Sequence, residues 1–243
     1  MKLRSVMAQA RMELILTLRR GESLVVTLAI PAGVLLVASR LEKIGDVKKP
    51  LEFVVPGVLA LAVIAAAMVN LGIGTGFERR YNVLKRLGST PLGKGGLVLG
   101  KTLSIVALEC LQGVILISLA IALGWTPTWH LIPAVLVIGA GTAVFAGLGL
   151  LSAGTLRAEA NLALLNLGYL IALAISGAAL PLSDLPRPAE LIARGLPPGA
   201  LTDSLRGLLQ PGKSLAVGSL LALVVWACVL PALAVRLFRW EEK

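Results

Sequence analysis

Three of the polar side chains that lie within long apolar runs of this sequence are candidates for a function, because a polar group is costly there. Glu109 is a carboxylate inside the run Val98–Leu123, and Gln112 follows three residues later, on the same face of a helix. Asn70 lies in the preceding run. Such groups can bind a cation, a proton or a polar substrate, or they can form hydrogen bonds between packed helices. The sequence leaves both interpretations open for Asn70, Glu109 and Gln112.

The sequence does not offer the residues that a metal centre or a nucleotide site needs. One histidine, His130, and two cysteines, Cys110 and Cys228, are present, and both cysteines fall in apolar runs as small apolar side chains. The segment Gly88–Gly95 nearly matches the phosphate-binding pattern GxxxxGK[ST], but Gly95 stands where that pattern needs a hydroxyl to hold Mg²⁺. We therefore expect no metal and no cofactor in this chain.

The elements that position these residues are six apolar runs. Hydrophobic residues make up 57% of the 243 residues and charged residues 15%, and the mean hydropathy is +0.89. A helix needs about 20 apolar residues to cross a bilayer core of about 30 Å. Lipid also requires every backbone amide to find its partner within its own segment, which favours helices over open strands. We predict an all-α, polytopic membrane protein with one transmembrane domain over residues 1–243 and six transmembrane helices at 24–39, 53–73, 98–123, 131–152, 162–180 and 215–235.

The basic residues predict how the chain faces the membrane. With six spans, fifteen of the 23 lysines and arginines lie on the side of the two termini. Basic loops favour the cytoplasm, so both termini and the loop 74–97 are predicted there, in a multi-pass protein of the cell membrane. The net charge of +10 does not indicate a nucleic-acid partner, because no basic face is interleaved with stacking aromatic residues.

Residues 1–20 have the periodicity of an amphipathic helix. Leu3, Met7, Ala10, Leu14 and Leu18 recur at spacings of three or four, and basic side chains fill the other faces. Such a helix is expected to lie in the membrane interface. It serves either as an anchor or as part of a docking site for a partner.

The predicted cytoplasmic loop 74–97 contains a second amphipathic pattern. Phe77, Tyr81, Leu84 and Leu87 follow helical spacing, which predicts one short helix over Phe77–Leu87 that ends before Pro91. A helix tied to two spans is suited to receive a push from a partner, although its basic residues also serve to fix the topology. Charged side chains fill its wet side: Glu78, Arg79, Arg80, Lys85 and Arg86.

The predicted outer loop 181–213 is long for a plain connection between spans. Its sequence predicts short, re-entrant-like helices at Pro188–Arg194 and Gly199–Leu209. The loop is interpreted either as a cap over the outer end of a pathway or as an inert surface loop. Leucines share one face of the second helix and a charged pair shares another: Leu201, Leu205 and Leu208, and Asp203 and Arg206.

Two segments resemble the type-2 ABC-transporter permeases. The stretch Glu78–Lys101, ERRYNVLKRLGSTPLGKGGLVLGK, is similar to the cytoplasmic loop of that family, and Leu196–Arg206 resembles its outer-loop pattern. The six spans, the N-terminal helix and the long loop before the last span extend the likeness to nearly the whole chain. The sequence departs from many members at Tyr81 and Asn82, where they carry a small residue and then threonine. The matching residues of the first segment are Glu78, Arg79, Leu84, Lys85, Arg86, Leu87, Thr90, Pro91, Leu92, Gly100 and Lys101.

The resemblance implies half of a transporter, with ATP and Mg²⁺ held by separate ABC ATPase subunits. It also implies a second permease chain, identical or different, across a central path. The substrate would be a drug, an antibiotic, a lipid, a glycolipid or another amphiphile, usually exported. In the family a coupling helix of the first cytoplasmic loop sits in a groove of the ATPase. The matching coupling residues are Phe77, Glu78, Arg79, Arg80, Tyr81, Leu84, Lys85, Arg86, Leu87, Thr90 and Pro91.

Two other classes of protein remain as alternatives. A channel or secondary carrier would work without ATP, and internal repeats with matching helix breaks would favour it. A membrane enzyme would need a cluster of histidine, cysteine or carboxylate residues, which the sequence does not contain. We therefore expect that this chain is not an enzyme by itself.

Overall fold

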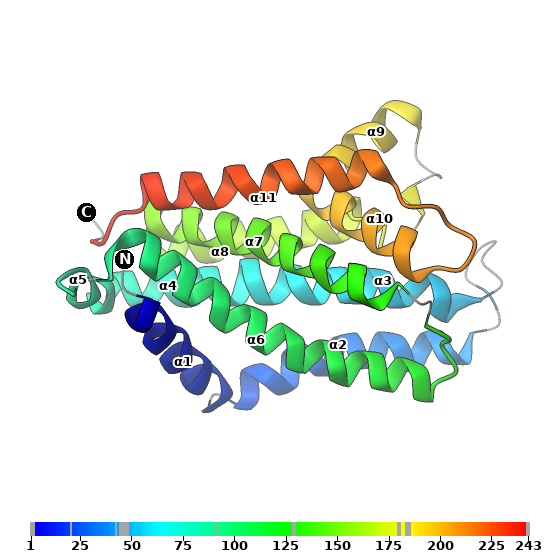
Figure 1. Ribbon diagram of the computed structural model, residues 1–243, viewed down its shortest axis with the longest axis horizontal. Coiled ribbons are helices and arrows are strands. Elements are labelled where there is room, and N and C mark those ends of the chain that lie inside the picture. Colours follow the sequence, from blue (N-terminus) through cyan, green and yellow to red (C-terminus); the bar gives the residue numbers. More distant parts are fainter. Residues whose placement is uncertain are drawn as a thin grey trace.

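The apolar runs form helices whose axes lie roughly along one direction (Figure 1). The computed structural model describes residues 3–19, 21–41, 43, 49–90, 92–127, 130–178, 181–182 and 186–241, with the backbone alone at residues 21–27 and 131. Within these ranges every regular element is a helix and none is a strand. The predicted all-α fold is confirmed.

Among the described residues, five helices are long and apolar enough to cross a membrane. Helix α2 (Gly21–Arg40) coincides with the first predicted span, and its described apolar part, Leu28–Arg40, is shorter than these five. The chain is therefore a polytopic membrane protein. The five helices are the continuous helix Pro50–Arg80, made of α3 (Pro50–Val63), the π-helical segment η1 (Ile64–Asn70) and α4 (Leu71–Arg80), then α6 (Gly93–Ala122), α7 (Leu131–Thr155), α8 (Ala158–Ile175) and α11 (Val217–Leu237).

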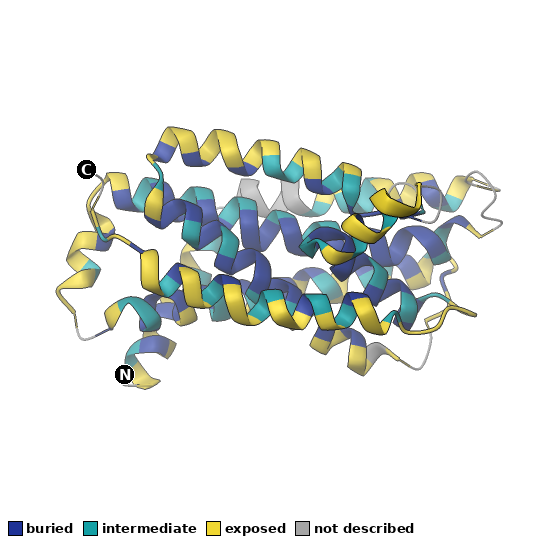
Figure 2. Ribbon diagram, turned by 90° about the horizontal axis from the view of Figure 1, so that it is seen from above, coloured by how far each residue is buried: buried dark blue, intermediate teal, exposed yellow. Residues whose placement is uncertain are grey.

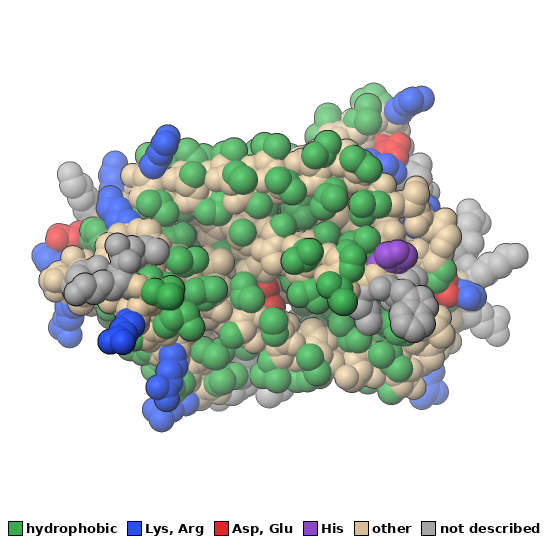
Figure 3. Space-filling view, viewed as in Figure 1, with side chains coloured by type: hydrophobic (Ala, Val, Ile, Leu, Met, Phe, Trp, Pro, Cys, Tyr) green, Lys and Arg blue, Asp and Glu red, His purple; other side chains and the backbone are tan. Residues whose placement is uncertain are grey.

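Large apolar side chains cover the outside of these helices. Ile132, Leu136 and Val114 are 79%, 73% and 65% exposed, and the outward faces of several long helices are exposed along their length (Figure 2). The face seen in Figure 3 is apolar over its middle, with lysine and arginine toward its two ends. Exposed apolar surface on this scale indicates that lipid is the solvent of the middle of the bundle.

Several helices extend beyond the spans predicted from hydropathy. The predicted span 53–73 is part of the longer helix Pro50–Arg80, and the predicted span 98–123 begins earlier, at Gly93. Hydropathy marks the part of a helix that lipid covers. The backbone hydrogen bonds of a helix, however, continue through polar residues outside that part.

Helix α7 lies at the centre of the packing. A methyl group on Gly149 would lie 2.7 Å from the backbone oxygen of Met68, and one on Gly147 would lie 2.7 Å from the backbone nitrogen of Pro231. These glycines let η1 and α11 approach α7 at backbone distance. Gly141 similarly admits the side chain of Leu201, whereas Gly139 faces open space.

The bundle has two different ends. The α5 end carries α1 (Leu3–Arg19), α5 (Val83–Gly88) and both chain termini, and the α10 end carries α9 (Arg187–Gly195) and α10 (Pro197–Leu209) (Figure 1). Helix α1 is inclined to the bundle and packs on α6, and it coincides with the amphipathic pattern of residues 1–20. Helices α9 and α10 coincide with the two short helices that the sequence predicts in the loop 181–213.

Candidate coupling surface and transport groove

The predicted helix Phe77–Leu87 is wrong, because the chain turns a corner within it. Helix α4 ends at Arg80 and α5 begins at Val83. Between them Asn82 has a φ of 59°, in the left-handed region. Asparagine tolerates this region better than other residues with a side chain, so it can end one helix and start another within two residues. The corner falls at the two positions where the sequence departs from the family pattern.

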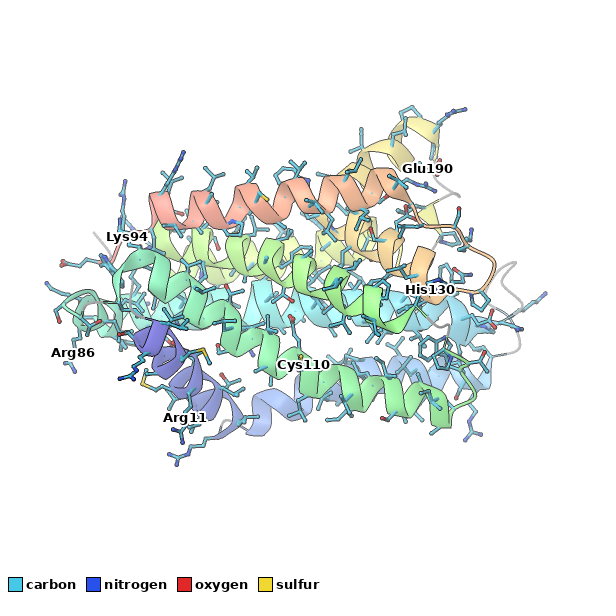
Figure 4. The ribbon with its side chains drawn as sticks, viewed as in Figure 1. Arg11, Arg86, Lys94, Cys110, His130 and Glu190 are labelled. Atoms are coloured by element: carbon cyan, nitrogen blue, oxygen red, sulfur yellow. The ribbon has the colours of Figure 1, made fainter. Side chains whose placement is uncertain are left out.

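Helix α5 presents one buried residue and a mostly exposed face. Leu84 is fully buried, whereas Tyr81 at the corner is 69% exposed. Lys85 and Arg86 are also exposed, and Arg86 lies at the α5 end of the molecule (Figure 4). Leu87 is partly buried, and Thr90 beyond the helix donates a hydrogen bond to the Leu87 carbonyl. Pro91, also predicted for this surface, lies outside the described residues. The corner therefore projects a short basic helix from the bundle.

The other predicted coupling residues lie inward of this surface. Phe77 stacks on Tyr81 with ring centroids 6.4 Å apart. Arg79 is 3% exposed, and its guanidinium donates hydrogen bonds to the carbonyls of Ala153 and Leu156, at 2.9 Å for Leu156. These carbonyls belong to the carboxyl end of α7, which favours a cation. Arg79 therefore fastens α4 to α7 and is not available on the surface.

Arg80 also contacts a neighbouring span. It forms an ion pair with Glu159 in the first turn of α8. Both side chains are about half exposed, so solvent screens the pair and its contribution to stability is small. The pair nevertheless places α4 beside α8 at the α5 end.

A buried ion triad joins three helices near the corner. The ammonium of Lys101, on α6, lies 2.6 Å from a carboxylate oxygen of Glu13, on α1, and 2.8 Å from one of Glu78, on α4. Lys101 is 1% exposed, and Gln9 also donates to Glu13. The sequence predicted Glu78 on the solvent-facing side of a helix, and it did not predict the ion pairs of Lys101 with Glu13 and Glu78. The signal for them was a lysine within an apolar helix, which requires anionic partners.

A lateral groove lies beside the continuous helix Pro50–Arg80. Its volume is about 930 Å³, and it is lined by residues of α2, of α3 through α4, of the α4–α5 corner with the first residue of α5, and of α8. The lining is mostly apolar, and its uncharged polar groups are Asn70, Tyr81, Asn166 and Tyr169. Glu78 is the one charged residue among the described residues that line it. The groove is large enough for a drug-sized or acyl-chain ligand.

The three candidate pathway residues are not together. Asn70 lines the groove, whereas Glu109 and Gln112 are not among the residues that line it. Both are buried on α6, and Thr142 of α7 donates a hydrogen bond to one carboxylate oxygen of Glu109. The other oxygen of Glu109 has no hydrogen-bond partner within the described part of the chain. Cys110, next to Glu109, lies about midway along the bundle (Figure 4).

The residues predicted as an outer gate also divide into separate environments. Leu201 is fully buried against α7. Arg206 lies with its guanidinium carbon 3.8 Å from the centroid of the Phe53 ring, and burial lowers the pKa of Arg206 to about 10, an effect that Asp203 opposes. Asp203 accepts a hydrogen bond of 2.7 Å from Ser219. Helix α10 is thus packed into the end of the bundle.

A comparison with known protein families identifies the family of this chain. The family model described as ABC-2 family transporter protein matches residues 43–236, about four fifths of the chain. A comparison with curated proteins gave no match. The match begins after α2 and spans the other helices that line the groove, the α4–α5 corner and the packed helix α10. The chain therefore belongs to the ABC-2 transporter family and is a membrane-embedded permease of a type-2 ABC transporter.

Proposed function

We propose that this permease exports an amphiphilic substrate, such as a drug, an antibiotic, a lipid or a glycolipid, using ATP that a separate ABC ATPase subunit hydrolyses. The ATPase would hold ATP and Mg²⁺ and dock on the coupling surface, which we define as Tyr81 together with α5. The observation that supports the proposal most strongly is a continuous helical connection between the groove and α5. The helix that lines the groove continues without a break into α4, and α4 meets α5 at one two-residue corner.

The contacts of α4 support transmission of movement from the coupling surface to the groove. Arg79 ties α4 to the end of α7, and Lys101 ties it to α1 and α6. A displacement of α5 would therefore move several spans together, because these buried contacts resist separation. The same helix contributes Val69, Asn70 and Ile73 to the groove wall. ATP-driven motion at one end of the helix would thus alter the width of the groove.

The groove supports both an amphiphilic substrate and a second permease chain. An apolar lining with a few polar groups suits a molecule that has an apolar body and a polar head. The groove opens to the side of the bundle, so a second chain on that side, identical or different, would convert it into an enclosed path.

The distribution of charge supports an orientation in the cell membrane. Arg11, Arg86 and Lys94 lie at the α5 end, which also carries both chain termini (Figure 4). By the preference of basic residues for the cytoplasm, we assign the α5 end, with the coupling surface, to the cytoplasmic side. The ATPase and its ATP are on that side.

Charge reversal on the coupling surface tests the proposal. The permease is purified with the ABC ATPase that assembles with it, and both are reconstituted in liposomes. Arg86→Glu is expected to weaken binding of the ATPase by about tenfold, the usual effect of losing a central arginine from an interface. ATP-driven transport falls with it. Lys213→Glu, the same reversal at an exposed site of the α10 end, serves as the matched control and leaves binding unchanged.

Two outcomes would contradict the proposal. The coupling surface is excluded if Arg86→Glu and Tyr81→Ala both bind the ATPase and transport as the parent does. Transport by the permease alone, without ATPase or ATP, would instead identify the channel or secondary carrier that the sequence left as an alternative.

A further inference from the structure

The chain after α11 turns back toward the coupling surface. Helix α11 ends at Leu237, and residues 238–241 follow at the α5 end (Figure 1). We call these residues the C-terminal strap. The strap is not part of any span, and its sequence has no helical or strand periodicity.

The root of the strap is anchored firmly. Phe238 is fully buried, and a methyl group on Gly154 at the end of α7 would lie 2.5 Å from its Cδ2 atom. Only glycine leaves room for the ring at this position. The next backbone amide, that of Arg239, donates a hydrogen bond of 3.1 Å to the Gly154 carbonyl. The strap therefore leaves α11 in a fixed direction, held against the end of α7.

The tip of the strap contacts α5 directly. The Trp240 ring lies over Gly88, so that a methyl group there would be 3.1 Å from its Cδ2 atom. The ring also meets Phe238 edge to face, with centroids 5.7 Å apart. Beyond it, Glu241 lies 3.2 Å from the ammonium of Lys85. One aromatic contact and one ion pair thus join the strap to α5.

The aromatic contact outweighs the ion pair. Lys85 and Glu241 have side chains that are 58% and 56% exposed, and exposed pairs contribute little. Trp240, by contrast, packs against a small cluster of buried residues that is separate from the main core. The cluster draws Val6 from α1, Leu84 from α5, Leu92 and Leu97 from the start of α6, and Phe238 from the strap.

Helix α5 depends on this cluster for its orientation. It has six residues, and helices of fewer than about 12 are marginal without packing partners. Its link to α4 is the two-residue corner at Asn82. Leu84 and Gly88 are one helical turn apart and hence share a face. On that face Leu84 packs into the cluster and Trp240 contacts Gly88, which is otherwise exposed.

We infer that the C-terminal strap, through Trp240 on Gly88, holds α5 in the orientation that binds the ATPase. Trp240 is a positioning residue and does not itself contact the ATPase. The inference rests on the proposed function, since it assigns the orientation of the coupling surface to a segment far from it in sequence. Without the ring, α5 spends only part of its time in the binding orientation. The apparent affinity for the ATPase falls by that fraction, while the rate at saturating ATPase is unchanged.

The first experiment measures amide hydrogen exchange in the permease alone, in lipid nanodiscs. Trp240→Ala is expected to speed exchange in residues 83–90 by roughly tenfold, because α5 opens more often when the ring that packs on Gly88 is removed. Trp240→Phe keeps a ring over Gly88 and restores most of the protection. Arg239→Ala is the matched control: it removes an exposed side chain of the same strap and retains the backbone hydrogen bond to Gly154.

The second experiment approaches the same contact from α5. Gly88→Ala adds a methyl group against the ring and is expected to weaken ATPase binding in the parent. In the Trp240→Ala background the same change has no further effect, because the ring it would meet is gone. ATPase titration then gives a weaker apparent affinity and an unchanged maximal transport rate for both single variants.

The outcomes separate the inference from the proposed function. The inference is overturned if Trp240→Ala leaves hydrogen exchange in residues 83–90 unchanged, or if Arg239→Ala speeds that exchange equally. It is also overturned if the effects of Gly88→Ala and Trp240→Ala on ATPase binding are strictly additive. Exchange is measured without any ATPase, so this result stands apart from the docking question. Normal ATPase binding by Arg86→Glu and Tyr81→Ala overturns the proposed function whatever the exchange data show.

Discussion

Among single residues, Lys101 has the most demanding environment. Its ammonium is 1% exposed and lies within 2.8 Å of the carboxylates of both Glu13 and Glu78. A buried ion pair adds little stability over apolar residues of the same size, but removal of one member leaves charge without compensation. The ion pairs of Lys101 therefore add little net stability, but they require that α1, α4 and α6 stay together.

Replacing Lys101 with methionine tests this requirement. Lys101→Met leaves two carboxylates facing each other without the cation between them, and we expect a loss of about 3–5 kcal/mol of stability. Thermal unfolding in nanodiscs measures it. Lys213→Met, at an exposed site, should unfold like the parent. The triple variant Lys101→Met, Glu13→Gln and Glu78→Gln should recover most of the loss, and a Lys101→Met protein as stable as the parent would contradict the role of the triad.

Arg79 lies in the segment where the sequence predicted it, but it is buried and not exposed to solvent. The helical pattern of Phe77–Leu87 placed Arg79 on a wet face beside Lys85 and Arg86. The structure buries it against the carbonyls of α7, because the corner at Asn82 rotates α5 away from the axis of α4. Periodicity assumes one uninterrupted helix, and a two-residue break changes which residues share a face.

At the scale of elements, the long helix Pro50–Arg80 connects the groove to the coupling surface. Its middle is the π-helical segment η1, and such segments are frequent at functional sites. Within η1, Ala65 and Asn70 line the groove, while Ala67 and Met68 approach Gly149 of α7 at backbone distance. One face of η1 thus fits the core closely while the other borders the groove.

Filling the groove should block transport without disturbing the fold. Ala65→Phe places a ring into the groove, and we expect substrate-stimulated ATP hydrolysis to fall by at least about tenfold, the scale on which apolar pockets reject a poor fit. Basal hydrolysis should be unchanged. Ala232→Phe adds the same ring to an exposed position of α11, which does not line the groove. Normal stimulation in Ala65→Phe would show that substrate passes elsewhere.

At the scale of the whole molecule, the two ends differ in construction. The α5 end gathers α1, the corner, the strap and both termini around a small second core. At the α10 end, α10 is packed into the bundle, with Leu201 and Leu205 fully buried. Under the proposed function a partner acts on the α5 end, whereas the α10 end is closed by its own packing.

Single cysteines at the two ends test the assigned orientation. In a variant with Cys110→Ser and Cys228→Ser, a cysteine is placed at Ser89 of the α5 end or at Lys213 of the α10 end, both exposed. A membrane-impermeant thiol reagent added to intact cells should label Lys213→Cys alone. Ser89→Cys should react only after the cells are permeabilised. Labelling of Ser89→Cys in intact cells would reverse the orientation.

The sequence by itself determined that lipid is the solvent, where the apolar helices lie and to which family the chain belongs. These properties can be read from local composition and motifs, because burial free energy follows the apolar area of each segment. The tertiary structure alone decided which charges are buried and which distant segment contacts α5. Lys101 and Glu13 are 88 positions apart, and Trp240 lies far along the chain from Gly88. Contacts at such separations depend on how helices pack around α7, which no local pattern encodes.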